Sequence, residues 1–305
     1  MKYIVLHRVK TRRANTLATP FLASPVVLFA AAMLGHALGD DTKTPISSVM
    51  YVHHDAHLLG EKLTIKNGDN YKTTVFPHQY RAAHFIDKND YSSHKSNPSG
   101  TKIEKIKGAP KDPRTYSKSL SLQPVFNADI EVSLVFGFDS NLSPSVERIK
   151  QSLEGRRLAG GTIDAIADVE IIDTFDGVLE SIGTGFVLLD RSDVLQHNNS
   201  MDHFIENLFN PEPVENKRPW RAATVCGYSM ITDFAQKKNV RNDSLHAYAE
   251  PLVGLFDLLS VRNILSMYNQ QTPMDAQHTK NKLFFSWAWS GSNFLLRPLS
   301  LNKEN

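Results

Sequence analysis

Two arginines and two glycines lie close together in the segment LEGRRLAGGTI, which spans Leu153 to Ile163. Arg156 and Arg157 end a stretch with helical character, and Gly160 and Gly161 come shortly after them. Glycine often ends a helix, because the left-handed conformation needed there costs little without a Cβ atom. The same residues also suit a loop that brings backbone amides and guanidinium groups against a phosphate. This segment alone favours the helix end, so the rest of the chain has to decide.

A second set of basic residues runs off the end of the first predicted strand. It consists of Arg8, Lys10, Arg12 and Arg13, with the amide of Asn15 just beyond. Contacts from such residues to phosphates give affinity that depends on salt and does not read sequence. These five residues are therefore candidate RNA ligands, together with Arg156, Arg157 and the two glycines.

The segment from Lys66 to Pro124 is basic and has little apolar periodicity. Counted from Glu61 to Pro124, it holds 12 Lys and Arg against 6 Asp and Glu. Its candidate RNA ligands are Lys72, Arg81, Lys102 and Lys105, and its tyrosines that could stack on bases are Tyr71, Tyr80, Tyr91 and Tyr116. A solvated, flexible basic loop or a projecting hairpin is the simpler interpretation of the same composition.

The histidines of YVHHDAHLL could also do chemistry. In a strand, His53, Asp55 and His57 would share one face, where they could bind a metal or cut RNA by acid–base catalysis. No second ligand cluster accompanies them, and the chain has no HExxH helix, nucleophile elbow, Walker loop or dinucleotide fingerprint. Structural or RNA-facing histidines, His54 included, are therefore favoured, and we expect no enzyme, metal or cofactor.

The single cysteine excludes an intramolecular disulfide and any cysteine-rich zinc site. Cys226 is expected to be a small buried apolar residue, and this cysteine usage fits a cytoplasmic setting.

Arg12 and Arg13 precede an apolar run, Val26 to Leu38, that resembles the apolar core of a signal peptide. At 13 residues the run is too short to span a bilayer. Pro20, Pro25 and the strand before them favour a buried helix instead.

Charge divides the chain into a basic and an acidic part. Residues 1–124 carry 18 Lys and Arg against 9 Asp and Glu, whereas residues 125–305 carry 16 against 23. The stretch from Asp164 to Glu215 has 12 acidic residues and only Arg191 as a basic one. This asymmetry suggests a polyanion on one side and a basic protein partner on the other, although ordinary solvated faces would look the same.

The order of predicted elements is strand, helix, strand, interruption, strand, helix, strand. The first three span Tyr3 to Val9, Val26 to Leu38 and Ser48 to Ile65; the last three are Ala128 to Phe138, a helix from Ser143 to about Leu158, and TIDAIADVEIID. This order is the ferredoxin-like (RRM-like) plan, an antiparallel sheet with two helices on one face and an open face that can bind single-stranded RNA.

The fold class expected is thus α+β. Its parts are a core in two halves (1–65 and 125–200), a thumb-like insertion (66–124), and an extension (201–305) predicted to be mainly helical. After the core, GFVLLDRSDVL predicts a strand and turn, and SMDHFIENLFN predicts a short helix. The segment from Leu245 to Tyr268 is predicted to be helical apart from Pro251.

Several of these segments occur in the order expected of one family. They are VLHRVKTRRANTLATPFLASP with its apolar helix, DIEVSLVFGF, RRLAGGTI, GFVLLDRSDVL, VRNDSLHAYAEPLVGLFDLLSVRNI and FFSWAW. Together they resemble the Csy-two family, the Cas-five-type subunit of the type I-F CRISPR surveillance complex. The resemblance covers most of the chain and is poorest at 66–124 and 201–225.

The resemblance implies a ferredoxin-like core with a thumb, and a non-catalytic subunit that holds the five-prime handle of the CRISPR RNA. Its implied partners are the large subunit and the first filament-forming backbone subunit, with target DNA possible at the thumb. The glycine loop would then lie beside the RNA backbone. Two alternatives stay open: a Cas-seven-like backbone subunit of a minimal type I-F variant, and a histidine-dependent endonuclease that processes CRISPR RNA.

Overall fold

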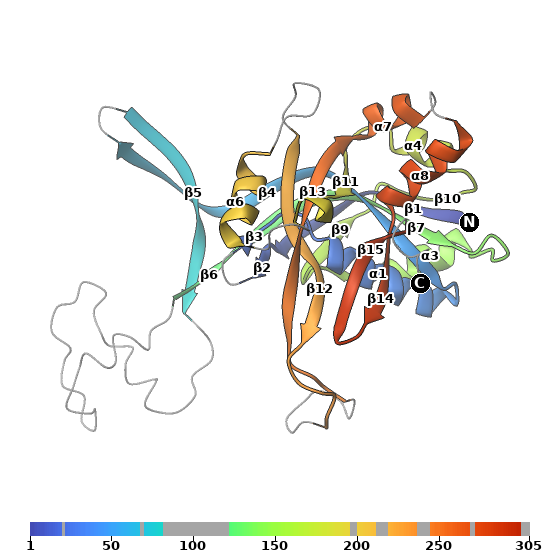
Figure 1. Cartoon of the computed structure of the whole chain (residues 1–305), viewed down its shortest axis with the longest axis horizontal. Helices are drawn as coiled ribbons and strands as arrows, with labels where there is room; N and C mark the ends of the chain where they lie inside the picture. Colours follow the sequence, from blue (N-terminus) through green and yellow to red (C-terminus); the bar gives the residue numbers. More distant parts are fainter. Residues whose placement is uncertain are drawn as a thin grey trace. The chain divides into compact units, whose positions relative to one another are not determined.

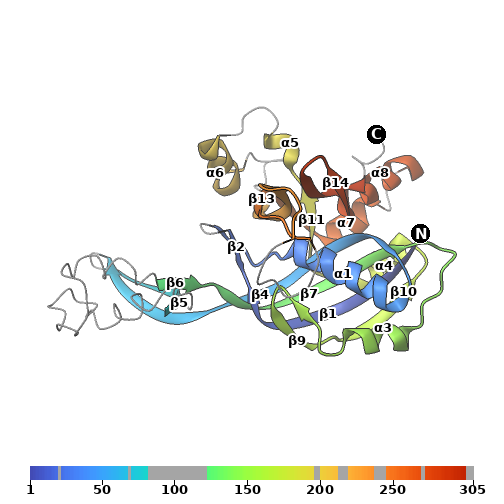
Figure 2. The same cartoon turned by 90° about the horizontal axis from the view of Figure 1, so that it is seen from below.

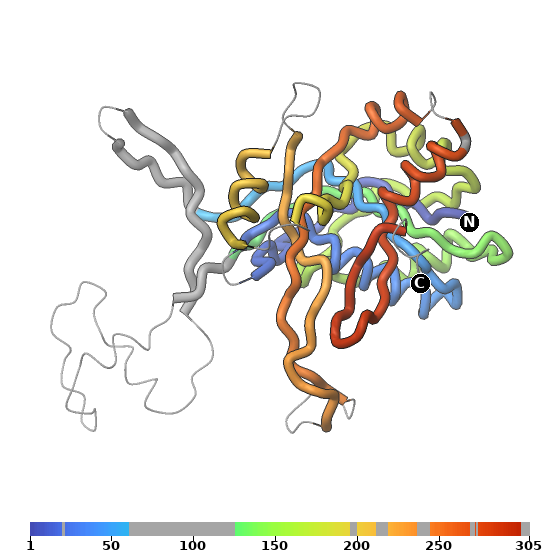
Figure 3. Tube along the Cα trace, viewed as in Figure 1, coloured from blue at the N-terminus to red at the C-terminus, as the bar shows by residue number. Residues whose placement is uncertain are grey.

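A computed structural model describes residues 1–19, 22–67, 70–81, 122–195, 200–211, 219–236, 245–268 and 272–299 (Figure 1, Figure 3). The chain divides into two compact units. One consists of Met1–His57 and Ala128–Asn305, and the other of Leu58–Asn127. The segment expected as an insertion, 66–124, falls inside this second unit. The fold is mixed α/β with mostly antiparallel strands, so the predicted class is confirmed at that level.

The first unit is built around strands from both halves of the predicted core. Its leading elements are β1 (Lys2–Asn15), α1 (Leu28–Thr42), β4 (Ile46–Asn67), β7 (Asn127–Phe138), α3 (Val146–Leu153), β9 (Gly161–Ala165) and β10 (Asp168–Ile172). In the sheet, β7 lies between β4 and β1. On the far side of β1, β10 pairs antiparallel with its first half and β9 with its second half. The segment TIDAIADVEIID is therefore two strands rather than one.

Strand β1 is longer than the predicted Tyr3–Val9, and its register against β9 shifts between Lys10 and Thr11. Arg8 and Arg13 have φ values of 49° and 55°, in the left-handed region that non-glycine residues rarely occupy. Near these two residues the simple alternation of buried and exposed side chains along β1 is interrupted. As a result Leu6, Val9 and Ala14 all reach the same core cluster despite their uneven spacing.

The two helices of the core differ in extent from the sequence prediction. Helix α1 begins and ends later than Val26 to Leu38, at Leu28 and Thr42. Its Gly35 packs on β7, where a Cβ atom would lie 2.6 Å from the Phe136 ring. Helix α3 begins after Ser145, whose side chain accepts from the backbone N–H of Arg148. It ends at Leu153, not near Leu158, since Gly155 has a φ of 69° directly beyond the cap.

The sheet has apolar packing on both faces. On one face, α1 and α3 cover residues such as Val132, Leu134 and Phe136, and Figure 2 shows α1 lying across these strands. On the other face, Tyr3 and Met50 pack in a second cluster. That cluster includes residues of α4 (Phe175–Ile182), which the sequence did not predict, and of α7 (Val261–Tyr268). The sheet face expected to be open is therefore covered at this end.

The C-terminal part is not mainly helical, which corrects the prediction for 201–305. It contributes β12 (Trp220–Met230), β13 (Ala249–Ser260), β14 (Phe285–Ser290) and β15 (Asn293–Pro298), besides α6 (Met201–Phe209), α7 and α8 (Pro273–Leu283). The segment predicted as one helix, 245–268, is β13 followed by α7. Strand β13 pairs with β12 on one edge and with β11 (Phe186–Asp190) on the other. Its central apolar residues, Leu255 and Phe256, are fully buried, and such a run does not show strand alternation.

These strands extend the sheet in the order β11-β13-β12-β15-β14-β4-β7-β1-β9-β8, where β8 is Arg157–Leu158. The remaining short elements are β2 (Leu17–Thr19), β3 (Leu22–Ala23) and α5 (Ser192–Leu195). In the second unit, β4 continues into a hairpin with β5 (Asn70–Arg81), and β6 (Leu122–Val125) pairs with β5. Among the helices of the described ranges, none has the length and apolar character to cross a membrane.

Candidate nucleic-acid interface

Arg8 is held in place by the chain itself. Its backbone N–H donates to Ser133 Oγ at 3.0 Å, and its guanidinium donates to Glu131 Oε1 and Thr184 Oγ1, both at 2.8 Å. Lys10 Nζ lies 3.8 Å from the other oxygen of Glu131. One carboxylate thus balances much of the charge of both predicted RNA ligands, and Arg8 is fixed by three contacts.

Arg12 and Arg13 are more available. Arg12 Nη2 lies 2.9 Å from Asp164 Oδ2, but the arginine side chain is 70% exposed. Water screens such a pair strongly, so a phosphate can replace the carboxylate at little cost. Arg13 donates its backbone N–H to Asp129 Oδ1 at 2.9 Å. Its exposed side chain has no ion pair within the described part of the chain.

The glycines of RRLAGG form a tight hairpin and do not end a helix. Leu158 pairs with Gly161, and the two residues between them, Ala159 and Gly160, have φ values of 50° and 77°. Two left-handed residues in succession are typical of a type I′ turn, which suits the twist of a two-residue hairpin. The helix-ending glycine is Gly155 instead.

Gly160 and Gly161 have different roles in this hairpin. A Cβ atom at Gly161 would lie 2.5 Å from Arg12 O and 2.6 Å from Ala14 N, so this glycine lets β9 pack closely on β1. The close approach expected for a bound strand is therefore occupied by the protein's own backbone. A Cβ atom at Gly160 would meet nothing within 4 Å, and this residue alone faces open space at the turn.

Arg156 and Arg157 also separate in role. Arg156 forms an ion pair with Asp41 at the end of α1, and its Nε donates to Ser152 O at 3.1 Å. Hydrogen bonds from Ser152 and Arg156 hold the pKa of Asp41 below its usual range. Arg156 thus joins α1 to α3. Arg157 is exposed, and the described residues offer its side chain no ion pair.

The pairing of β8, β9 and β1 places two of the candidate cations in one row. Arg157 is opposite Thr162, and Thr162 is opposite Arg12. Residues opposite one another on neighbouring strands share a face, and all three are exposed. The strand spacing puts the two arginines about 10 Å apart. We call Arg12, Thr162 and Arg157 the arginine row.

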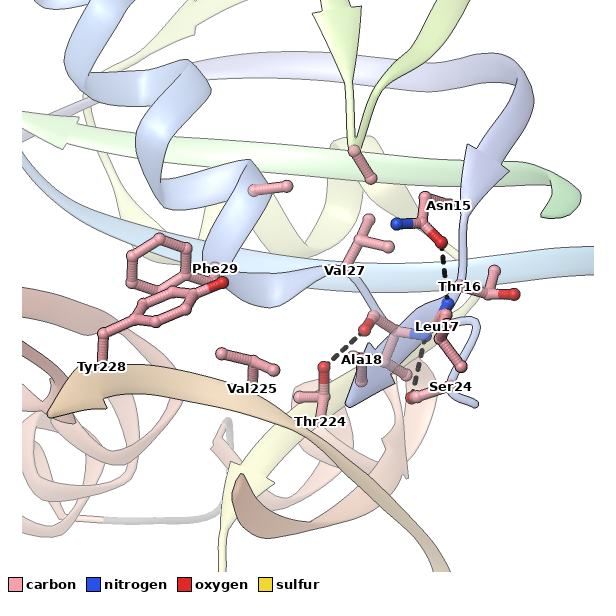
Figure 4. Close-up of a pocket in the computed structure, with 13 residues that line it drawn as sticks. Asn15, Thr16, Leu17, Ala18, Ser24, Val27, Phe29, Thr224, Val225 and Tyr228 are labelled. Carbon is pink, nitrogen blue, oxygen red and sulfur yellow. Dashed lines mark hydrogen bonds between the residues drawn. The ribbon is translucent and has the colours of Figure 1, made fainter. Parts of the chain in front are cut away.

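A cavity of about 170 Å³ lies beside the same hairpin (Figure 4). Ala159 of the turn lines it with Asn15, and Phe29 and Tyr228 form an aromatic wall with ring centroids 4.8 Å apart. The side-chain oxygen of Asn15 accepts from the Leu17 N–H at 3.0 Å, which fixes the amide at the cavity. Thr224 of β12 donates to Val26 O at 2.6 Å and so holds β12 against the start of α1. Apolar and aromatic walls with a few fixed polar groups are typical of sites for small planar groups.

The histidines of YVHHDAHLL lie on both faces of β4 and do not come together on one of them. His54 Nε2 lies 2.7 Å from Ser133 Oγ, and burial, with the charge of Arg8, lowers the pKa of His54 to about 4. His53 is on the opposite face of β4, where it stacks on Tyr51, and burial lowers its pKa. Asp55 and His57 share the face of His53 by alternation, but they are exposed. The described part of the chain has no cluster of three metal-ligating side chains.

His7 lies beside a serine and a carboxylate, but the three groups do not have the arrangement of a catalytic Ser–His–carboxylate relay. Ser181 Oγ lies 3.2 Å from His7 Nε2, and Glu170 Oε2 lies 3.3 Å from the same nitrogen. A catalytic relay needs the serine and the carboxylate on opposite nitrogens of the ring. Cys226 is equally inert, because burial raises the pKa of its thiol to about 12.

The remaining predicted residues belong to the second unit. Lys72 and Arg81 lie in β5, as do Tyr71 and Tyr80, and the structure describes their backbone only. The other predicted residues there lie outside the described residues: Lys102, Lys105, Tyr91 and Tyr116.

Two features of this region could not be found from the sequence. One is the set of carboxylates that pair with the candidate basic residues, and the other is the set of side chains that line the cavity. Glu131 is 123 positions from Arg8 in the chain, and Thr224 is 198 positions from Val26. No local pattern marks such pairs, because only the sheet order brings them together.

No family model matches the chain, and a comparison with curated proteins finds no match.

Proposed function

We propose that this protein is a non-catalytic RNA-binding subunit of a type I-F CRISPR surveillance complex, where it holds the five-prime handle of the CRISPR RNA. The resemblance of its segments to the Csy-two family motivates the proposal. We also propose that its core is ferredoxin-like. The element order of β1, α1, β4, β7, α3 and β10, with the sheet order β4-β7-β1-β10, supports this assignment.

The arginine row is the observation that carries the RNA-binding proposal. Arg12 on β1 and Arg157 on β8 are both exposed, on either side of β9, with Arg13 and Lys10 nearby on β1, so a phosphate backbone can follow this edge. The cavity lined by Tyr228 and Phe29 lies next to the turn, and its aromatic side chains would contact a base of the same strand. Arg8 and Arg156 act in this proposal as positioning residues, because each is held by the chain's own carboxylates.

The second unit, with 12 basic and 6 acidic residues, would be the thumb that contacts RNA or target DNA. The partners would be the large subunit and a filament-forming backbone subunit, and the complex would act in the cytoplasm. The acidic stretch from Asp164 to Glu215 supports a basic protein partner. The neutral, half-buried His54 and the separated histidines support a role without catalysis.

The experiment is a titration of the protein with a fluorescent single-stranded RNA that carries a CRISPR-repeat handle. We expect Arg12→Ala with Arg157→Ala to weaken binding and to make the plot of log affinity against log salt shallower by about 0.7 per lost contact. Arg262→Ala removes an exposed charge on α7 and serves as the matched control. If the double variant stays folded and keeps both affinity and salt slope, the row does not bind RNA.

A cleavage assay in EDTA tests the enzymatic alternative. Repeat RNA should remain intact when it is incubated with the purified protein. Site-specific cleavage that is lost in His53→Ala, His54→Ala or His57→Ala would overturn the non-catalytic proposal.

A further inference from the structure

Helix α6 presents an apolar stripe to solvent. Met201, Ile205 and Phe209 follow one another at intervals of four residues, so they lie on one side of the helix. Their exposed fractions are 56%, 45% and 72%. A large apolar side chain on a surface is ordinary when alone, but three in line along one helix mark a contact surface.

An acidic stripe runs beside the apolar one. Asp202 and Glu206 each follow a residue of the apolar stripe, and both are exposed. Helix α6 itself contains no Lys or Arg. The nearest basic residue before it in the sequence, Arg191, is engaged by Asp193 at 3.0 Å and by Asp257 at 2.6 Å. The exposed face of α6 is thus both apolar and negative.

The opposite side of α6 is committed to the rest of the chain. Arg221 Nη1 donates to Asn207 O at 2.9 Å, and Arg221 is itself fixed by Asp257. His203 Nε2 lies 3.1 Å from Val194 O. Phe204 and Leu208 are half-buried on this side. The helix is therefore attached by one face, and the two stripes form the face that is left.

We propose that the exposed face of α6 docks a basic amphipathic helix of another protein. An apolar stripe on the partner would cover Met201, Ile205 and Phe209, and flanking Lys or Arg would meet Asp202 and Glu206. RNA is a poor occupant, because the two carboxylates repel phosphates. A second copy is also a poor occupant, since a symmetric contact brings together two faces of the same negative charge and, when the helices are antiparallel, places the acidic stripes against each other. This inference stands on α6 alone and goes beyond RNA binding by naming the surface of a protein contact.

The test uses a synthetic amphipathic helix of leucine and lysine as the probe, with a leucine–glutamate helix of the same pattern for comparison. Two variants remove one stripe each: Ile205→Ser with Phe209→Ser, and Asp202→Asn with Glu206→Gln. A matched control, Met274→Ser with Glu250→Gln, changes exposed residues elsewhere. We expect the lysine helix to bind the native protein and each stripe variant to bind about tenfold more weakly. The acidic-stripe variant should also lose the salt dependence, and the control should match the native protein.

Three results would overturn the proposal. The first is a lysine helix that does not bind, or that binds the stripe variants as it binds the control. The second is a native protein that sediments as a dimer while the apolar-stripe variant sediments as a monomer, because a second copy would then be the occupant. The third is binding to neutral phospholipid vesicles that the same variant loses. Circular dichroism checks that α6 persists, and handle-RNA affinity of these variants should stay unchanged, which separates this inference from RNA binding.

Discussion

Arg221 Nε lies 2.7 Å from Asp257 Oδ1, and both side chains are almost wholly buried, at 2% and 4% exposed. Arg191 Nη1 approaches the other oxygen of this carboxylate at 2.6 Å. Asp257 therefore links the residue after β11 to β12 and β13. The buried Arg221 guanidinium depends on this carboxylate for its charge balance, whereas the partly exposed Arg191 also pairs with Asp193.

Replacing Asp257 by asparagine should destabilise the fold by about 3–5 kcal/mol, because it leaves buried arginine charge uncompensated. Urea unfolding measures the loss. Asp193→Asn is the matched control, since Asp193 pairs with the same Arg191 at the surface, and it should cost less than about 1 kcal/mol. Equal losses in the two variants would contradict a special role for the buried carboxylate.

The two glycines of the hairpin should respond differently to alanine. Gly161→Ala forces a Cβ atom against the backbone of β1, 2.5 Å from Arg12 O. This overpacking should lower the free energy of unfolding by about 3 kcal/mol, the upper end of its usual cost. Gly160→Ala meets no neighbour and carries only the cost of a left-handed residue, about 1 kcal/mol. Thermal melting ranks the two variants. The reverse order would mean that the hairpin does not pack on β1 as described.

Tyr228→Ala tests whether the cavity takes a base. Loss of a stacking partner should weaken handle-RNA binding by about 1–3 kcal/mol. The salt slope should stay unchanged, because stacking releases no counterions. Trp220→Ala, which removes an exposed aromatic ring elsewhere, is the control. A Tyr228 variant with native affinity would leave the cavity without a part in RNA binding.

Stability should fall as the pH drops from 6.5 towards 4. Burial lowers the pKa of His54 to about 4, so between these values the unfolded chain takes up a proton that the folded chain refuses. The stability present above pH 6.5 is therefore lost through this window. Because His54 is only half-buried, solvent screening limits its share to about 1–2 kcal/mol. His54→Gln keeps a group able to contact Ser133, and its melting temperature should fall less between pH 7 and pH 5.

Much of the N-terminal architecture could be predicted because each of its elements carries a clear local signal, such as alternating apolar residues in a strand or a start signal before a helix. The strand predicted at 128–138 matches β7, and the Ser143-Pro144 signal lies just before α3. Strand β13 could not be predicted, since burial of both its faces at Leu255 and Phe256 removes the alternation that marks a strand. The roles of Arg8 and Arg156 could not be predicted either. Their carboxylate partners, Glu131 and Asp41, are more than a hundred positions away.

The attachment of α6 has a mechanical consequence. No residue of α6 is fully buried, and in the part of the chain that the structure describes the hydrogen bonds at Asn207 and His203 join it to β12 and α5. Strands β12 and β13, in contrast, share ten residue pairs that would have to shear together. A pull on α6 would therefore peel the helix away while the sheet beneath it stays intact. A partner bound to α6 could therefore be pulled away by force without unfolding the rest of the protein.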